Sequence, residues 1–334
     1  MRLPHFDLRQ PSTVEEALSL MEEFRGSALA LAGGTDLIPL MRYRLEVPST
    51  LVSLQKVDCL KGISLQDGRV FIGAMTPLAD LVSSSIISDN FPALLQAARA
   101  VGAPPILNLA TVGGNICQNS RCLYYNQSRT WRLERPACFK AGGNVCHAVP
   151  KGNKCFSVYS GDLAPALVAL DAVAAVEKRG RSRSVSIEEL FSGNGLHPIA
   201  LGKEELVTGV AILLPEKSSN SSYMKMRARP SIDYPLVSAA ACATRGGNGK
   251  IEKIRLVLGA VGPSPVVVGD VGRFFEGKTL DEVDFDALSE IIGKGARMVD
   301  NLTFPGSYRK AMLSVIAEKA VRAALRPGAG KEKQ

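Results

Sequence analysis

The stretch Thr111-Val112-Gly113-Gly114-Asn115 says most about the fold, and a similar one, Ala32-Gly33-Gly34-Thr35-Asp36, comes earlier in the chain, after a short apolar run. Glycines in such loops can adopt positive φ and expose backbone N–H groups toward a phosphate. One Gly-Gly turn is weak evidence, because most are tight turns without another role. Two of them, each beside Thr and Asn or Asp, favour a pocket that holds a diphosphate from two sides.

Neither loop matches the common nucleotide-binding fingerprints. Both lack the Gly-x-Gly-x-x-Gly pattern of a Rossmann fold and the Lys-Ser/Thr ending of a P-loop. A standard Rossmann domain and a nucleotide triphosphatase are therefore excluded. The later segment Ser160-Gly161-Asp162-Leu163 is interpreted as another part of the same pocket.

Four cysteines lie between these segments, in a region rich in Gly, Asn and Lys. Four thiolates are the ligands of a [4Fe–4S] cluster, which can organise a loop with loose ligand spacing. Structural zinc is an alternative, although it usually shows short Cys-x₂₋₄-Cys pairs and the gaps here are longer. Unliganded thiols are a third possibility. The predicted metal ligands are Cys122, Cys138, Cys146 and Cys155.

The other cysteines, one histidine and several aromatic residues are not predicted metal ligands. Cys117 belongs to the second glycine loop, whereas Cys59 and Cys242 lie in apolar contexts typical of buried thiols. His147 is interpreted as a neighbour of the metal site and not as a ligand. Aromatic side chains interleaved with the cysteines are predicted to shield the site from water: Tyr124, Tyr125, Trp131, Phe139 and Phe156.

Composition limits the class of protein. With 334 residues, 46% hydrophobic and 22% charged, the chain can bury a large core and form two or three domains. The net charge is +8, but the basic residues are spread along the chain without a nucleic-acid motif, so no nucleic-acid partner is expected. No apolar segment reaches the ~20 residues of a membrane span and no signal peptide is recognisable, which predicts a cytoplasmic protein without a span.

Apolar periodicity predicts a mixture of helices and strands in β-α-β order at the start of the chain. A capping box formed by Ser12 with Glu15, or by Thr13 with Glu16, begins the first predicted helix. The polar stretch 215–222 is the predicted linker, and 330–334 the predicted frayed tail. Helices are predicted over 13–24, from 77 onward, over 91–101 and over 307–325, and strands over 28–32, 51–54, 70–74, 168–176, 205–213, 237–244 and 251–261.

Residues 31–37, 109–117 and 162–171 together resemble the FAD-binding medium subunits of the molybdenum hydroxylases, the xanthine dehydrogenase and carbon monoxide dehydrogenase group. The similarity extends to 225–240 and so covers nearly the whole chain. It implies an α+β fold, with a two-part vanillyl-alcohol-oxidase-type (PCMH) FAD-binding domain and a small α+β C-terminal flavoprotein domain. The implied ranges are 1–216 and 223–328, with an iron–sulfur insert loop over 118–158.

The resemblance also implies which residues hold FAD. Positions matching the two glycine loops bind the diphosphate, and those matching Asp162 and Lys225 lie near the flavin or its ribityl chain. Arg227 and Arg229 either contact FAD phosphates or a partner subunit, or belong to a solvated strand. No catalytic side chain is predicted, because the cofactors carry the chemistry. The predicted FAD-binding residues are Ala32, Gly33, Gly34, Thr35, Asp36, Asn108, Thr111, Gly113, Gly114, Asn115, Gln118, Asp162 and Lys225.

The chain differs from most of these subunits in one segment, and this difference points to a smaller group within the family. Most of these subunits pass within a few residues from the Gly-Gly-Asn-Ile-Cys loop to the Asp-Leu-x-Pro segment, but here about forty residues intervene. This insert is similar to that of 4-hydroxybenzoyl-CoA reductase β subunits, which carries an additional [4Fe–4S] cluster. Electrons would then pass from ferredoxin through the cluster and FAD to a [2Fe–2S] small subunit and a molybdenum-binding large subunit, where 4-hydroxybenzoyl-CoA loses its phenolic hydroxyl.

The implied assembly is a heterohexamer of three subunit types. Two alternatives stay open. One is the FAD subunit of an oxidising molybdenum hydroxylase that passes electrons to NAD⁺ or quinone. The other is a zinc-stabilised scaffold subunit without catalytic function.

Overall fold

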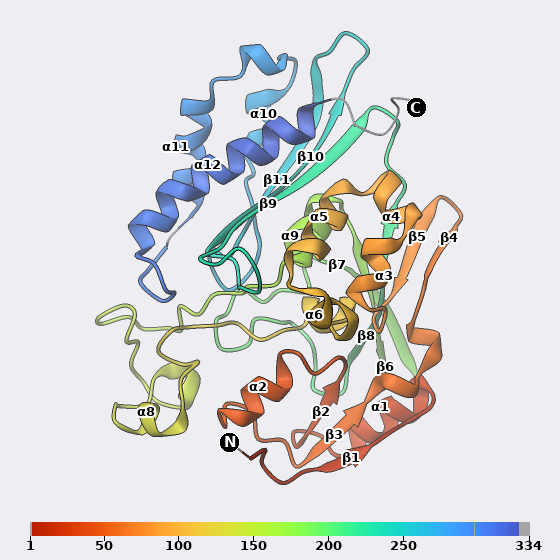
Figure 1. Ribbon diagram of the computed structural model, residues 1–334, viewed down its shortest axis with the longest axis vertical. Helices are drawn as coiled ribbons and strands as arrows, with labels where there is room; N and C mark the ends of the chain where they lie inside the picture. Colours follow the sequence, from red (N-terminus) through yellow and green to blue (C-terminus); the bar gives the residue numbers. More distant parts are fainter. Residues whose placement is uncertain (1, 297, 327–334) are drawn as a thin grey trace.

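Three sheets and the helices around them make up the computed structural model, which describes residues 2–296 and 298–326 (Figure 1). The first sheet is parallel, with the strand order β1-β3-β2. The second has five strands in the order β4-β5-β8-β6-β7, and the third has four in the order β12-β11-β10-β9; both are antiparallel.

The parallel sheet confirms the β-α-β order predicted for the start of the chain. The side chain of Thr13 accepts a hydrogen bond from the backbone N–H of Glu16 at 3.1 Å, so the predicted cap begins the first helix. The elements are β1 (Asp7–Arg9), α1 (Val14–Glu23), β2 (Ala28–Leu31), α2 (Leu37–Arg42) and β3 (Thr50–Ser53).

The five-stranded sheet and the helices on it form the second part of the domain. Two short 3-10 turns, η1 (Leu54–Lys56) and η2 (Asp58–Leu60), lead into it. Its strands are β4 (Ile63–Gln66), β5 (Arg69–Gly73), β6 (Val173–Lys178), β7 (Arg181–Ser186) and β8 (Leu206–Leu213), and its helices are α3 (Leu78–Ser83), α4 (Ser85–Asn90), α5 (Pro92–Ala100), α6 (Pro104–Leu109), α7 (Val112–Ile116) and α9 (Leu163–Ala169).

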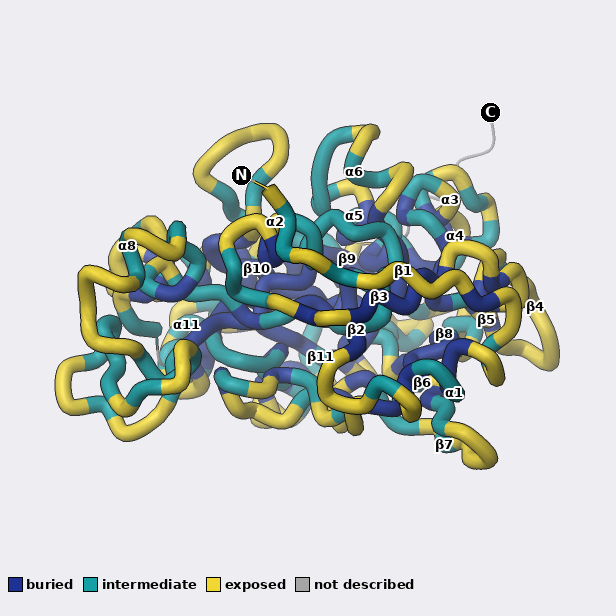
Figure 2. The backbone as a smooth tube through the Cα atoms, turned by 90° about the horizontal axis from the view of Figure 1, so that it is seen from below, coloured by how far each residue is buried: buried dark blue, intermediate teal, exposed yellow. Residues whose placement is uncertain are grey.

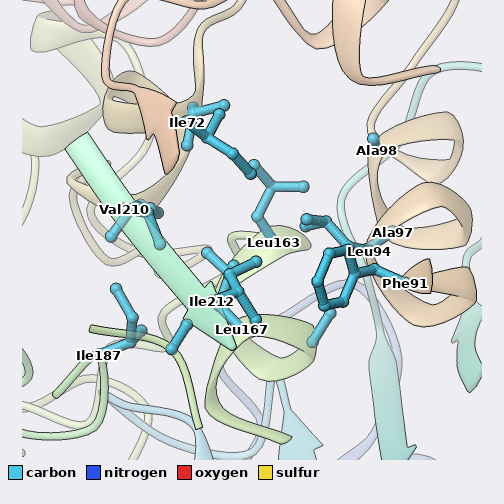
Figure 3. Close-up of a cluster of buried hydrophobic side chains, with 14 of the residues drawn as sticks. Ile72, Phe91, Leu94, Ala97, Ala98, Leu163, Leu167, Ile187, Val210 and Ile212 are labelled. Atoms are coloured by element: carbon cyan, nitrogen blue, oxygen red, sulfur yellow. The ribbon is translucent and has the colours of Figure 1, made fainter. Parts of the chain in front are cut away.

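The strand predicted over 168–176 is wrong in its first half. Residues up to Ala169 belong to α9, and β6 begins only at Val173. Every residue of α9 is buried, so its sequence is apolar on all sides and lacks the helical period that distinguishes a helix from a strand. Figure 3 shows the reason: Leu163 and Leu167 of α9 lie between Ile212 of β8 and Phe91, which precedes α5.

The third sheet is buried on both faces. Along β10, Ala239 and Ala241 pack into the core formed with the C-terminal helices, whereas Ala240 and Cys242 face the core of the first domain. Side chains alternate across a strand, so β10 joins the two domains directly. The strands are β9 (Ser219–Met226), β10 (Val237–Arg245), β11 (Ile251–Gly259) and β12 (Val266–Val267).

The predicted linker over 215–222 is only partly correct, because β9 begins at Ser219. Two serines in this strand, Ser221 and Ser222, are buried and hydrogen-bonded to helices. Ser221 accepts a hydrogen bond from the backbone of Ala93 at 3.2 Å, and Ser222 donates one to the carbonyl of Ala320. The polar residues at the start of β9 therefore form hydrogen bonds to neighbouring helices and do not belong to a loop.

Helices α10 (Val271–Phe275), α11 (Phe285–Gly295) and α12 (Gly306–Leu325), with the 3-10 turn η4 (Leu280–Glu282), cover the outer face of the third sheet (Figure 1). The predicted tail over 330–334 lies outside the described residues. Within the described part of the chain, no helix has the length and apolar character needed to cross a membrane.

Residues 118–158, here called the cysteine segment, form a lobe with little regular structure beside the two domains (Figure 1). Its elements are the short helix α8 (Arg129–Leu133) and the 3-10 turn η3 (Phe139–Ala141). The backbone around α8 is mainly exposed or intermediate in burial, whereas the central strands β3 and β10 are mainly buried and dark blue (Figure 2).

Candidate cofactor sites

The first glycine loop joins the parallel sheet to α2 and lies directly against the second loop. Gly34 has a φ of +71°, a conformation that favours glycine. A Cβ atom on Gly33 would lie 1.7 Å from the carbonyl oxygen of Leu109. Glycine is therefore required at this position because two backbones meet there.

The second loop is the first turn of α7. The side chain of Thr111 accepts a hydrogen bond from the N–H of Gly114 at 3.1 Å, while the N–H of Gly113 donates to Ala74 at 2.8 Å. Positive φ was expected in both loops, yet Gly34 alone of the four loop glycines has it. Position 114 favours glycine for a different reason, because a Cβ atom there would lie 3.0 Å from the Thr111 side-chain oxygen and 3.5 Å from Ala32.

Asp162 forms the deepest charged contact of the site. Its carboxylate accepts hydrogen bonds from Tyr223 at 2.6 Å and from Lys225 at 2.9 Å, and the side chains of the ion pair are 4% and 3% exposed. Burial raises the pKa of Asp162, while the ammonium of Lys225 opposes that shift. Since Asp162 precedes α9 and Lys225 lies on β9, this pair joins the two domains at the pocket.

A cavity of about 160 Å³ opens where these segments meet. The buried hydroxyl of Ser160 lines it and has no hydrogen-bond partner among the described residues, as expected for a group that faces a bound molecule. Six predicted FAD-binding residues line the cavity: Thr35, Asp36, Gly114, Asn115, Gln118 and Asp162.

The other predicted FAD-binding residues lie behind or beside the cavity wall. Lys225 stands behind Asp162, and Asn108 lies exposed on α6, away from the lining. The rest contribute backbone to the two touching loops: Ala32, Gly33, Gly34, Thr111 and Gly113.

The loop between β9 and β10 supplies a wall of the cavity that the sequence did not indicate, apart from Arg229. Tyr234 stacks on the guanidinium of Arg121 at 3.9 Å, and both contact Asp36 at 3.4 Å. Burial raises the pKa of Asp36, and the charge of Arg121 opposes this. The loop has no helical or strand period, so only the packing of the two domains reveals its role. Its lining residues are Arg229, Ile232, Asp233 and Tyr234.

Comparison with known proteins shows the family to which the chain belongs. Residues 4–125 and 140–216 match the family described as FAD binding domain in molybdopterin dehydrogenase. The chain belongs to this family. Residues 221–324 match the CO dehydrogenase flavoprotein C-terminal domain. The chain is therefore the FAD-binding subunit of an oxidoreductase of the molybdenum hydroxylase type.

Individual relatives agree with the family assignment. The chain is 30% identical over 269 residues to the FAD-binding subunit PaoB of aldehyde oxidoreductase from Escherichia coli, covering 78% of this chain and 82% of that protein. It is 27% identical to the carbon monoxide dehydrogenase medium chain of Afipia carboxidovorans, covering 96% of both. A solved structure of Cu,Mo-CO dehydrogenase has the same fold, with a TM-score of 0.80, 24% identity and coverage of 97% and 99%. The predicted two-part FAD-binding fold with its C-terminal domain is thus confirmed.

The family match leaves residues 126–139 unmatched, a shorter stretch than the predicted insert of 118–158. This stretch contains α8 and one of the four cysteines. All four cysteines nevertheless line one small cavity of about 20 Å³, together with Tyr124, Tyr125, Phe139, His147 and Phe156. The segment thus brings the predicted ligands together.

Aromatic rings stand beside the four cysteines in the walls of this cavity, and no carboxylate among the described residues lines it. Burial raises the pKa of the Cys122 thiol to about 11. His147 hydrogen-bonds the carbonyl of Pro136 at 2.9 Å and lies in the wall. Trp131 was predicted to shield the site, but it lies outside the cavity lining and under Arg135. Cys59 was predicted to be buried and is exposed.

No group of three or more His, Cys, Asp or Glu side chains among the described residues is placed to hold a metal ion. A single zinc ion needs four ligands within roughly 2.3 Å of one point. The cysteines of a [4Fe–4S] cluster can stand further apart, because each thiolate binds a different iron at a corner of the cluster. Four thiols line this cavity together with Lys140, His147 and Ser157. The [4Fe–4S] ligand set stays a prediction.

Two residues outside the cysteine segment position its ends. Asn301 accepts a hydrogen bond from Leu123 at 2.8 Å through its backbone and donates one from its side chain to Phe156. These two partners directly follow Cys122 and Cys155. Gly195 was also missed: a Cβ there would lie 3.1 Å from the Cys155 sulfur, so a larger residue would crowd the ligand.

Proposed function

We propose that this chain is the FAD and [4Fe–4S] electron-transfer subunit of a molybdenum enzyme of the 4-hydroxybenzoyl-CoA reductase type. Ferredoxin is the proposed donor, and reductive dehydroxylation of 4-hydroxybenzoyl-CoA the proposed reaction of the assembled enzyme. The observation that carries the proposal is the convergence of four cysteines on one cavity within a segment that leaves and rejoins the FAD-binding loops.

The proposed cluster ligands are Cys122, Cys138, Cys146 and Cys155, and the proposed FAD contacts are the glycine loops with Asp36, Gln118 and Asp162. When bound, FAD supplies two-electron chemistry and the cluster one-electron chemistry. Among the described residues, the side chains that line the FAD cavity position the flavin and exclude water, and none is assigned a catalytic role.

The charge of the cysteine segment supports a docking site for an acidic electron carrier such as ferredoxin. The segment contains seven Lys or Arg residues and one acid, Glu134. Arg129, Arg135, Lys151 and Lys154 are exposed. A basic surface steers an acidic partner toward it and raises the association rate.

The proposed partners are a molybdenum-binding large subunit and a [2Fe–2S] small subunit, in a cytoplasmic heterohexamer. The names of the relatives support a multi-subunit enzyme, because they are a medium chain and an FAD-binding subunit. The same names favour a second candidate, the FAD subunit of an oxidising hydroxylase that delivers electrons to NAD⁺ or quinone. The zinc-stabilised scaffold is the third.

The test uses the native complex, purified without oxygen. About four iron and four sulfide per copy of this chain are expected, with one FAD. In Cys146→Ser, ferredoxin should reduce FAD more slowly, while FAD reduced by dithionite still passes electrons to the molybdenum subunit. Cys59→Ser, an exposed thiol outside the cysteine segment, is the matched control and should behave as wild type.

Other outcomes select among the candidates. Iron and sulfide together with reduction of NAD⁺ but no reaction with ferredoxin would favour the oxidising hydroxylase. One zinc and no iron would favour the scaffold. A wild-type rate of FAD reduction by ferredoxin in a variant that lacks the cluster would exclude the cysteine segment as the electron port.

A further inference from the structure

Lys140 places its ammonium group inside the cysteine segment among neutral oxygen atoms. Nζ donates to the side chain of Asn119 at 2.8 Å, to the carbonyl of Gly195 at 2.8 Å and to the hydroxyl of Ser120. The Ser157 hydroxyl lies 3.4 Å away. These partners come from both ends of the segment and from the loop at Gly195, so the position of the charge is well determined.

No carboxylate among the described residues forms an ion pair with Lys140. Two acids act on it without direct contact: Asp36, and Glu46, which accepts a hydrogen bond from the side chain of Asn119 at 3.1 Å. A poorly solvated cation whose direct partners are all neutral is costly unless an anion lies close by.

The cysteine cavity is where that anion belongs. Lys140 lines the cavity together with the four cysteines. Its partner Asn119 directly follows Gln118, which lines the FAD cavity. Lys140 thus lies between the proposed cluster and the FAD-binding loop.

We propose that Lys140 is the partly buried counter-cation of the cluster and sets its reduction potential; this inference rests on the proposed function. Reduction adds one electron, and therefore one negative charge, to a cluster already surrounded by four thiolates. A fixed positive charge in a poorly solvated site stabilises the reduced state more than the oxidised state. Lys140 is a positioning residue, because it acts through the cluster and contacts no substrate.

The test is Lys140→Met in the native complex, with the cluster's midpoint potential measured by a redox titration followed by electron paramagnetic resonance. The equilibrium constant for reduction of the cluster should fall at least tenfold. For a one-electron couple this moves the midpoint potential to a value more negative by about 59 mV or more. Lys154→Met makes the same chemical change at an exposed position next to Cys155 and should leave the midpoint nearly unchanged. Equal shifts in the two variants, or none in Lys140→Met, would overturn the proposal.

If the Lys140→Met complex does not retain its cluster, the midpoint potential is measured in Glu46→Gln instead. Removing one of the negative charges that act on Lys140 should move the midpoint in the opposite direction, to a less negative value. An unchanged midpoint in Glu46→Gln would then overturn the proposal. A wild-type complex without iron would instead overturn the proposed function, and this inference with it.

Discussion

The FAD cavity and the cysteine cavity are built in different ways. The FAD loops meet backbone to backbone, as at Gly33 and Leu109, and rest on a buried core of helices and sheet. The cysteine segment has few buried side chains and is attached by hydrogen bonds to Asn301, to the carbonyl of Gly195 and to residues 43–46. The first site is shaped by the core of the fold, whereas the second has little regular structure around it.

This difference has a physical basis. A site whose walls are close-packed backbone can form before its ligand arrives. A loop with few apolar contacts gains its order when a metal cluster ties its ligands together, and the binding free energy then becomes folding free energy. The two cofactors should therefore be separable by mutation.

Cys138→Ser should have the largest effect, because it removes one of four proposed ligands from a loop with little other support. Iron and sulfide should be lost from the anaerobically purified complex, while the FAD content stays at the wild-type level. Metal analysis and flavin absorbance measure both. Loss of FAD together with iron would show that the two sites are not independent.

Asp162→Asn should have the next largest effect. It leaves the ammonium of Lys225 buried without a counter-charge, which lowers the free energy of unfolding by about 3–5 kcal/mol. Urea denaturation, followed by flavin fluorescence, measures the loss. The double variant Asp162→Asn/Lys225→Met should recover part of it, and a loss below about 1 kcal/mol in the single variant would contradict a tight buried pair.

Gly33→Ala tests the contact between the two FAD loops. The added Cβ meets the Leu109 carbonyl, and forcing backbone apart costs about 1–3 kcal/mol. FAD affinity of the reconstituted apoprotein should fall by roughly tenfold to a hundredfold, at about 1.4 kcal/mol for each factor of ten. Gly247→Ala, where a Cβ meets no atom within 4 Å, is the control. The iron content should not change in either variant.

Arg229→Ala should have the smallest effect, because Arg229 lies at the exposed rim of the FAD cavity. Its side chain is 71% exposed and pairs with Asp233 at 3.3 Å. Exposed pairs contribute up to about 1 kcal/mol, so FAD affinity should fall less than about fivefold. A larger loss would instead indicate a direct contact with the FAD phosphates.

Much of the framework could be predicted from the sequence. The cap at Thr13, the strand at 237–244 and the helix over 307–325 follow from local patterns, because side-chain period and capping act over a few residues. The two glycine loops were also recognisable, since their composition departs from that of an ordinary strand or helix. The family resemblance rested on these same loops.

Contacts between distant segments could not be predicted in this way. The buried helix α9 has no polar face, so its sequence resembles a strand until its packing between two domains is known. Three hydrogen bonds join residues that are far apart in the chain. Tyr234 donates to Asp36, the side chain of Asn301 donates to Phe156, and Lys140 donates to the carbonyl of Gly195. Sequence determined which local structures and cofactor loops form, and tertiary packing decided which side chains face each cofactor, because burial and charge pairing depend on neighbours that only the fold brings together.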